Sequence, residues 1–399
     1  MGLTPRGETA AVVGTVSGAH FVSHVYLLAY PPLFPLLAVE FDLSTTQLGL
    51  LVTAIYVPTL LFQLPVGDLV DRVGAKRVLV GGIVVTSLGI ALSGLAGSYP
   101  LLLACAFVSG IGQCAFHPAD YALLDAVTDH ENEGTAFGLH TFGGFAGFAA
   151  APVVIGGLGI VAGWTLALGT VGSLGFAYAA LVALTMSPVH GRELGGTEPA
   201  TTASAGATVR DLVSFVRRRE LLLVFAFYAL SMMAIVGLQS FTTVLAVERY
   251  GLDGAAANTL LTAHLASMAV GILLGGPLAD RLPPRGVLGL AFSLSALCLW
   301  VALLGAAEDS VGPFLALSLV GLLIGIALPS RDRFANAVAD PDAAGKSFGF
   351  FFTGLSLGAV LSPALLGLVV DARSAVAAFV VVGAFLFLAV SVVAWTARG

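Results

Sequence analysis

A short charged stretch between two long apolar stretches occurs twice in the sequence. The first copy, residues 67–77, reads GDLVDRVGAKR, and the second, residues 276–285, reads GPLADRLPPR and begins 209 residues further on. Each copy has about 20 mainly apolar residues on both sides, which is the length a helix needs to cross a bilayer. The repeat therefore predicts a duplicated membrane protein, in which each copy is a charged turn between two membrane helices.

The composition agrees with a membrane location. Of the 399 residues, 58% are hydrophobic and 10% are charged, whereas soluble proteins have about 25% charged residues. So few polar residues cannot cover a water-exposed surface, but a bilayer acts as the solvent for an apolar one. The 49 glycines suit closely packed membrane helices. The three cysteines all lie in apolar stretches, so no disulfide framework is implied.

Twelve apolar stretches are long enough to cross a bilayer. We therefore predict an all-α membrane protein with spans at about 11–39, 46–67, 77–97, 100–124, 134–160, 163–187, 221–247, 255–279, 286–306, 312–337, 345–370 and 374–396. Three prolines, Pro31, Pro32 and Pro35, predict a kink or break near the outer end of the first span. The long hydrophilic segment 188–220 predicts a cytoplasmic linker between two six-helix bundles, residues 1–187 and 221–399.

The positions of Lys and Arg predict the orientation. If both termini are cytoplasmic, 15 of the 17 Lys and Arg residues lie on the cytoplasmic side, and only Arg249 and Arg373 lie opposite. Positive charges concentrate in the cytoplasmic loops of membrane proteins. We therefore expect a multi-pass protein of the cell membrane (plasma or inner) with cytoplasmic termini. Its expected partners are the lipid bilayer and a small-molecule substrate, with no nucleic acid, and we expect a monomer.

The two halves also match outside the charged turns. Residues 134–157 and 345–367 align at an offset of 211, with five identical pairs: Gly138 and Gly349, Gly143 and Gly354, Gly147 and Gly358, Pro152 and Pro363, Gly156 and Gly367. The fifth and eleventh spans are therefore equivalent. Two equivalent six-helix halves are typical of transporters whose substrate site lies between the halves near the midplane.

The first charged turn resembles the helix 2–3 signature of the major facilitator superfamily, which reads roughly G-x-L-x-D-R-x-G-(R/K)-(R/K). The second copy keeps Gly, Leu, Asp and Arg, but Pro283 replaces the second Gly. The resemblance implies the fold of that superfamily, with twelve transmembrane helices in two six-helix repeats. It also implies a cytoplasmic gate, which we assign to the two turns and to a charged group near the end of the tenth span: Gly67, Asp71, Arg72, Lys76, Arg77, Asp280, Arg281, Arg285, Arg331, Asp332 and Arg333.

A narrower resemblance is to the fosmidomycin-resistance branch of the superfamily. That branch has Phe-His-Pro-Glu in helix 4, and in helix 1 a His with an Asp four residues on. Residues 116–118 and His20 match this pattern. His24 stands in place of the helix 1 Asp, and Ala119 in place of the Glu, with Asp120 one position along. Proton coupling and substrate are therefore expected to differ from those of the branch.

The fifth span also resembles the antiporter motif G-x3-G-P-x2-G-G. The matching residues are Gly147, Ala151-Pro152 and Gly156-Gly157, so one Gly is replaced by Ala and the spacing is shifted. This resemblance favours export over uptake.

Ionisable side chains inside the spans are few, and each costs about 2.5–3.5 kcal/mol at mid-helix on insertion scales for charged residues. His20 and His24 share one helix face, and a His pair can hold or relay a proton near neutral pH. Gln113, His117 and Asp120 fall within an arc of roughly 60°. We predict a proton-coupling or substrate cavity lined by His20, His24, Gln113, His117, Asp120, His140, Gln239 and His264.

Other interpretations of these residues stay open. Each His or Gln could be a hydrogen-bonded packing group, and Asp120 could pair with a gate Arg at the cytoplasmic mouth. An Arg at 331 or 333 could bind an anionic substrate instead of closing the gate. We predict no metal site, because no neighbouring Cys, Asp or Glu in the sequence completes the His pair.

The sequence favours a secondary active transporter over an enzyme. It has no Walker loop, no dinucleotide fingerprint between strand and helix, and no triad or zinc spacing, so neither an enzyme activity nor a cofactor is expected. Our leading interpretation is an antiporter that exports a small organic compound or drug, driven by protons. The alternatives are an uptake carrier or uniporter for a small organic anion, and a membrane scaffold or sensor that transports nothing.

Overall fold

The computed structural model of the protein describes residues 5–129, 132–186, 217–304, 311–340 and 344–396. Across these residues the chain is helical and has no strand. Twelve of the described helical stretches are long and apolar enough to cross a membrane, which confirms the prediction of twelve spans. The greater part of the predicted linker, residues 188–216, lies outside the described residues.

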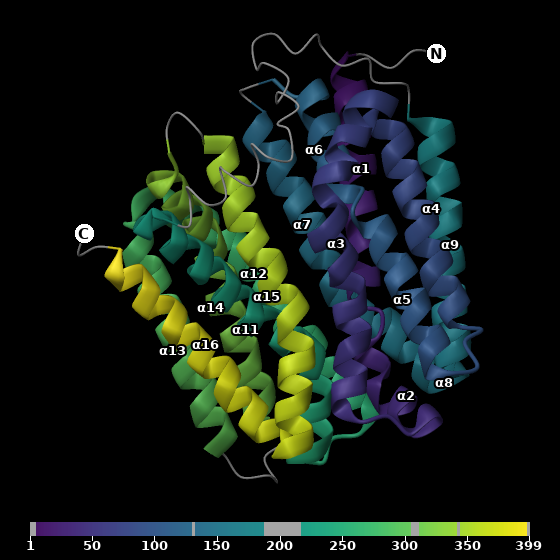
Figure 1. Ribbon diagram of the computed structural model, residues 1–399, viewed down its shortest axis with the longest axis vertical. Helices are drawn as coiled ribbons and strands as arrows, with labels where there is room; N and C mark the ends of the chain where they lie inside the picture. The colour runs from purple at the N-terminus through teal and green to yellow at the C-terminus, as the bar shows by residue number, and fades with distance from the viewer. Residues whose placement is uncertain (1–4, 130–131, 187–216, 305–310, 341–343, 397–399) are drawn as a thin grey trace.

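The helices form two bundles that lie side by side (Figure 1). The N-terminal bundle consists of α1 (Pro5–Leu27), η1 (Pro31–Leu33), α2 (Phe34–Phe41), α3 (Thr45–Val73), α4 (Ala75–Ser93), α5 (Tyr99–Gln113), α6 (Phe116–Val127), α7 (Glu133–Ala151), η2 (Pro152–Gly156), α8 (Gly157–Ala162) and α9 (Trp164–Thr185). The C-terminal bundle consists of α11 (Arg219–Tyr250), α12 (Gly254–Arg281), α13 (Pro284–Leu304), α14 (Gly312–Val338), α15 (Ala344–Ala372) and α16 (Ala375–Trp395).

Prolines interrupt three of the spans of the N-terminal bundle, and the fifth span is interrupted at the π-helical turn η2, which begins at Pro152. The first span stops at Leu27 and continues through the 3-10 turn η1 into α2, as the three prolines predict. The fourth span is interrupted between Gln113 and Phe116, one turn before Pro118. Proline has no N–H to bond to the carbonyl one turn back, so the helix opens there.

The first charged turn is much shorter than the sequence indicated. Helix α3 continues through Asp71 and Arg72 to Val73, and α4 begins at Ala75. The whole change of direction occurs at Gly74, whose φ of 95° strains any residue with a Cβ. The prediction of a turn across 67–77 was therefore wrong in extent, because one glycine is sufficient and the charged side chains belong to the helix ends.

The two bundles repeat the same helix contact, which supports the duplication. Gly143 and Gly147 of α7 lie against α1, because a Cβ on them would come within 2.6 Å of the Ser17 carbonyl and 2.3 Å of the Phe21 carbonyl. Their equivalents in α15, Gly354 and Gly358, lie in the same way against Phe225 and Ala229 of α11. Small residues four apart let two membrane helices approach closely.

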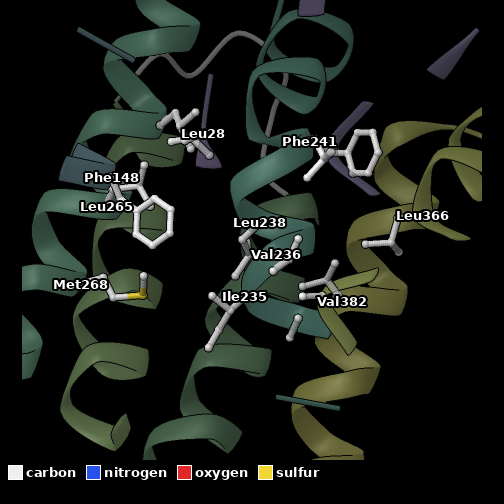
Figure 2. Packing of buried hydrophobic residues seen from close by; sticks show 14 of the residues in the cluster. Leu28, Phe148, Ile235, Val236, Leu238, Phe241, Leu265, Met268, Leu366 and Val382 are labelled. Atoms are coloured by element: carbon white, nitrogen blue, oxygen red, sulfur yellow. The ribbon is translucent and has the colours of Figure 1, made fainter. Parts of the chain in front are cut away.

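The bundles are joined at the end of the molecule where α2 leads into α3 and α15 leads into α16, here called the α2 end (lower end in Figure 1). Thr243 of α11 donates to the Pro31 carbonyl at 3.0 Å, and Asn258 of α12 donates to the Pro32 carbonyl at 3.2 Å. One hydrophobic cluster includes residues of both bundles; Figure 2 shows Phe148 of α7 beside Leu265 and Met268 of α12.

At the opposite end, where Gly74 joins α3 to α4 and which is here called the Gly74 end, the buried cluster belongs to one bundle. Val16, Leu79, Phe116 and Leu123 are among its members, and all of them come from the N-terminal bundle. Tyr121 of α6 and Asp332 of α14 lie close enough to interact electrostatically across the bundles. Both are exposed, so the bundles do not close over them. The structure is thus closed at the α2 end and open at the Gly74 end.

Candidate functional site

Four histidines and one aspartate come together inside the N-terminal bundle. Helix α1 provides His20 and His24 one turn apart, α6 provides His117 and Asp120, and α7 provides His140. The Asp120 side chain has no exposed surface, and His20, His24 and His140 are also buried. We call these five residues the His–Asp cluster.

Asp120 lies between two imidazoles. Its Oδ2 atom is 3.5 Å from Nδ1 of His20 and 3.9 Å from Nε2 of His140. The rings of His20 and His140 are themselves in contact, with centroids 3.9 Å apart. His24 lies 4.2 Å from His20 and equally far from Phe148, measured between ring centroids. No Lys or Arg of the described residues pairs with Asp120, so the expectation of a gate arginine as its partner finds no support here.

The polar atoms of the cluster have unused hydrogen-bonding capacity. Among the described residues, neither carboxylate oxygen of Asp120 has a hydrogen-bond partner, nor have the Nδ1 atoms of His20, His24, His117 and His140. Buried polar groups in proteins are nearly always hydrogen-bonded, and exceptions call for a functional explanation. An isolated carboxylate charge is costly to bury, whereas a carboxyl group and imidazoles at these distances can share a proton.

Gln113 borders the cluster at the end of α5. Its Nε2 donates to the Ser23 carbonyl at 2.9 Å, and its Oε1 accepts from the Ser23 hydroxyl at 2.7 Å. This double hydrogen bond fixes α1 against α5 between the two α1 histidines. Gln113 is therefore a positioning residue next to the cluster, with both ends of its side chain occupied.

Gly144 of α7 makes room for the α1 imidazoles. A Cβ at this position would lie 2.4 Å from Cδ2 of His20 and 2.7 Å from Cε1 of His24, distances that real Cβ atoms do not show. Gly144 was not among the predicted site residues, since it stands directly after Gly143, which packs against α1, and has no polar group of its own. Its neighbours His20 and His24 were the available signal.

The cluster is covered by Tyr121 on the side that faces the C-terminal bundle. Tyr121 lies 5.7 Å from both His117 and His140, measured between ring centroids, and it is 44% exposed. His117 is only half-buried. These two residues therefore connect the buried carboxylate with the space between the bundles. Tyr121 was also missed, although it follows Asp120 directly.

Three histidines of the cluster are close enough together to ligate one metal ion. His20, His117 and His140 each have a ring nitrogen that lies within 4.8 Å of the other two. Three imidazoles can ligate a metal ion such as zinc, and they can equally hold a proton. Only His20 and His24 are neighbours in the sequence; the fold adds His117, His140 and Asp120 to this pair. The absence of a metal stays a prediction.

Two of the predicted cavity residues lie in the C-terminal bundle, away from the cluster. His264 of α12 is buried, and its Nδ1 is hydrogen-bonded to the Leu317 carbonyl of α14 at 2.9 Å. Gln239 of α11 is 2% exposed. His264 therefore has the contacts of a packing residue.

The predicted gate residues contact their own bundle in this conformation. Lys76 donates to the carbonyls of Ala183, at 2.9 Å, and Met186, at the C-terminal end of α9. Arg333 lies 3.8 Å from Asp280 within the C-terminal bundle. Asp71, Arg72 and Arg281 are exposed. Among the described residues no ion pair connects the gate residues of one bundle with those of the other.

The remaining gate residues are also held locally. Arg77 donates to the Val73 carbonyl at 3.3 Å, and Arg285 donates to the Thr396 carbonyl at 3.3 Å. A Cβ on Gly67 would meet nothing within 4 Å. Arg331 is bonded to Asp332, its neighbour in sequence.

Comparison with known proteins agrees with the fold. The family model described as Major Facilitator Superfamily matches residues 16–260 and 248–398. A solved bacterial homologue of the human lysosomal transporter Spinster, in an inward-facing and occupied conformation, has a TM-score of 0.83 at 16% identity, with 100% of this chain and 98% of that chain covered.

Curated relatives point in the same direction. The fosmidomycin resistance protein of Escherichia coli is 26% identical over 391 residues, which cover 93% of this chain and 89% of that protein. A probable sulfoacetate transporter of Cupriavidus necator is 26% identical over 385 residues, which cover 90% and 87%. These relatives are transporters rather than enzymes. The chain is a multi-pass membrane transporter of small molecules and belongs to the Major Facilitator Superfamily.

Proposed function

We propose that the protein is a proton-coupled exporter of a small organic compound and that the His–Asp cluster is its proton site. The observation that carries the proposal is the fully buried carboxylate of Asp120, 3.5 Å from His20 and 3.9 Å from His140. Ionisable residues inside a membrane protein are costly and mark proton or substrate pathways. With four imidazoles around it, this carboxyl group can take up and release a proton within the bundle.

Proton uptake can be coupled to movement through α1, α6 and α7. His20 and His24 are in α1, Asp120 is in α6 and His140 is in α7, so a change of charge acts on three helices of one bundle. The alternating-access movement that we propose rocks residues 1–187 against residues 221–399, with 188–220 as the linker. The contacts at the α2 end would open as the Gly74 end closes, and Asp71, Arg72, Lys76 and Arg77 would then gate that end together with Asp280, Arg281 and Arg285.

The direction and orientation in this proposal rest on the sequence and on the relatives. The antiporter-like residues of α7 and η2 favour export, as does the resemblance to a protein named for fosmidomycin resistance. The Lys and Arg bias favours cytoplasmic termini, so that the structure would be open to the cytoplasm. We propose the cell membrane as the location and a monomer as the functional unit.

A second candidate is an uptake carrier or uniporter for a small organic anion. Two relatives support it: a probable sulfoacetate transporter, and a probable L-galactonate transporter of Escherichia coli, 27% identical over 136 residues. The direction of flux distinguishes the two candidates. A scaffold or sensor that transports nothing would be favoured instead if no flux were found and a stable protein partner co-purified.

The test uses the purified protein in proteoliposomes. Ligands are first selected by thermal shift from a panel that includes fosmidomycin and sulfoacetate, and the flux of each ligand is then measured with and without a pH gradient. We expect the gradient to drive uphill movement of the ligand against protons. We also expect EDTA to leave this flux unchanged, because no metal is predicted to take part. Flux unaffected by the gradient, or by Asp120→Asn, would contradict the proposal. Oriented vesicles give the direction.

A further inference from the structure

Arg331 stands at the position in the C-terminal bundle that Asp120 occupies in the N-terminal bundle. The two residues are 211 positions apart, as are Pro118 and Pro329 two residues before them. Each also precedes the last residue of its helix, Val127 or Val338, by seven residues, about 10 Å of helix. The duplication therefore places an acidic and a basic side chain at equal depth on the two sides of the molecule.

The guanidinium group of Arg331 is held in a fixed position. Its Nε donates to Oδ1 of Asp332 at 2.9 Å, and its central carbon lies 4.9 Å from the ring centroid of Tyr228. The Tyr228 hydroxyl donates to the same Asp332 oxygen at 3.0 Å, and its ring stacks on Phe351. Asp332 and Tyr228 thus fix one edge and one face of the guanidinium plane.

The guanidinium group keeps donors for a further acceptor. Among the described residues, its Nε donates to Asp332 and the Tyr228 hydroxyl is its second hydrogen-bonding neighbour, whereas a guanidinium has five N–H donors. Tyr121 of the N-terminal bundle is close enough to interact with it electrostatically, so this guanidinium lies near the boundary between the two bundles. Its side chain is 13% exposed, against 48% for Arg333 two residues on.

We propose that Arg331 is the anion anchor of the substrate site, and that the transported compound is a small organic anion with a carboxylate, sulfonate or phosphonate group. Two parallel Nη–H groups match the two oxygens of such a group. Asp332 offsets the positive charge of Arg331 when no anion is bound. This lowers the cost of keeping Arg331 in a membrane helix. This inference rests on the proposed transport function and names its substrate class.

This proposal moves Arg331 from the predicted cytoplasmic gate to the substrate site. The sequence placed this residue in the cytoplasmic gate, where an arginine would pair with an acidic residue of the other bundle. In the structure it is bound to the adjacent Asp332 and shielded by Tyr228. Arg333, which is more exposed and lies near Asp280, is the better candidate for a gate residue.

The test measures the thermal stability of the purified full chain in neutral detergent at constant ionic strength. The probes are phenylphosphonate, benzenesulfonate and benzoate, with the neutral benzenesulfonamide and benzamide as matched controls. We expect saturable stabilisation by at least one anion and none by the neutral compounds. Arg331→Gln should weaken the apparent affinity by about tenfold or more, as expected for the loss of charge-assisted hydrogen bonds.

Three further variants make the result specific. Arg331→Lys keeps the charge but loses the planar fork, so an intermediate affinity is expected. Asp332→Asn removes the internal counter-ion and should strengthen anion binding. Arg373→Gln, which removes an exposed arginine of the same bundle outside the predicted site and gate, is the control and should behave like the wild type. The inference is overturned if no anion stabilises the protein, if the neutral compounds stabilise it equally, or if Arg331→Gln and Arg373→Gln bind alike.

Flux measurements separate this inference from the proposed function. If a pH gradient drives a neutral compound and Arg331→Gln leaves that flux intact, the anion anchor is wrong while proton coupling stands. If an anion binds through Arg331 but no pH gradient moves it, proton coupling is wrong while the anchor stands.

Discussion

Asp371 of the C-terminal bundle caps the start of α3 in the N-terminal bundle through Thr46. Its Oδ2 atom accepts hydrogen bonds from the Thr46 backbone N–H at 2.8 Å and from the Thr46 hydroxyl at 2.5 Å. The other oxygen accepts from the Thr45 backbone N–H at 2.8 Å. A carboxylate at a helix N-terminus satisfies free N–H groups and interacts favourably with the helix dipole. Here the carboxylate and the helix belong to different bundles, so this cap must break when the α2 end opens.

Asp371→Ala is therefore expected to favour the conformation that is open at the α2 end. The lost cap is worth about 1 kcal/mol, a change of about fivefold in the population ratio. The measurement is the distribution of distances between spin labels at that end of the two bundles.

Asp253→Ala is the matched control, because Asp253 caps its own helix, with Oδ1 accepting from the Ala256 N–H at 2.8 Å. It should lower stability without shifting the distance distribution. Equal distributions for the two variants would show that the contact between Asp371 and Thr46 does not hold the bundles together.

Gly144→Ala is expected to disturb the His–Asp cluster without removing any of its titratable groups. The added methyl group would overlap both His20 and His24, whose nearest ring atoms lie at 2.4 and 2.7 Å. Misplacing reacting groups by about 1 Å can cost a large factor in rate, so pH-driven flux should fall by about tenfold or more.

Gly138→Ala in the same helix has no atom within 4 Å of its added Cβ and serves as the control. Its flux should match the wild type. If Gly144→Ala transports as well as Gly138→Ala, the geometry of the two imidazoles does not matter for coupling.

Lys76→Met is expected to reduce the stability of the fold, in addition to any effect on the gate. The Lys76 ammonium binds carbonyls of Ala183 and Met186, at the end of α9, where a positive charge favours the helix dipole. The expected loss is about 1 kcal/mol, measured as a lower unfolding temperature in detergent. Arg77→Met, which removes only a local bond to Val73, should change the unfolding temperature much less; an equal change for both variants would contradict this role.

The fold was predictable from the sequence because the patterns that indicate it extend over most of the chain. Twelve apolar stretches and a repeat at an offset near 210 involve hundreds of residues, and the twelve spans are confirmed. The turn at Gly74 was misjudged in length because the charges of Asp71 and Arg72 suggested a loop. A helix end at a membrane surface accepts charged side chains equally well, so charge alone does not show where a helix stops.

The site was predictable in part. His20 and His24, and likewise His117 and Asp120, could be grouped by helical spacing, since each pair lies on one helix. That α7 brings His140 to the same place depends on a contact between helices distant in sequence, which spacing does not contain. For the same reason His264 could not be told apart from a site residue, although the fold gives it the Leu317 carbonyl as a partner. Gly144 and Tyr121 matter through shape and position rather than through a recognisable motif.

Proton coupling through Asp120 is the central claim, and Asp120→Asn tests it most directly. The asparagine has nearly the same shape but cannot take up a proton. Net flux driven by a pH gradient should therefore respond differently from exchange of the ligand across the membrane. The measurement compares, in the same proteoliposomes, pH-driven net flux and counterflow exchange of a ligand from the thermal-shift panel. Asp125→Asn, an exposed position on the same helix, is the control. We predict that Asp120→Asn abolishes net flux and retains exchange, while Asp125→Asn retains both; undiminished net flux in Asp120→Asn would contradict the account.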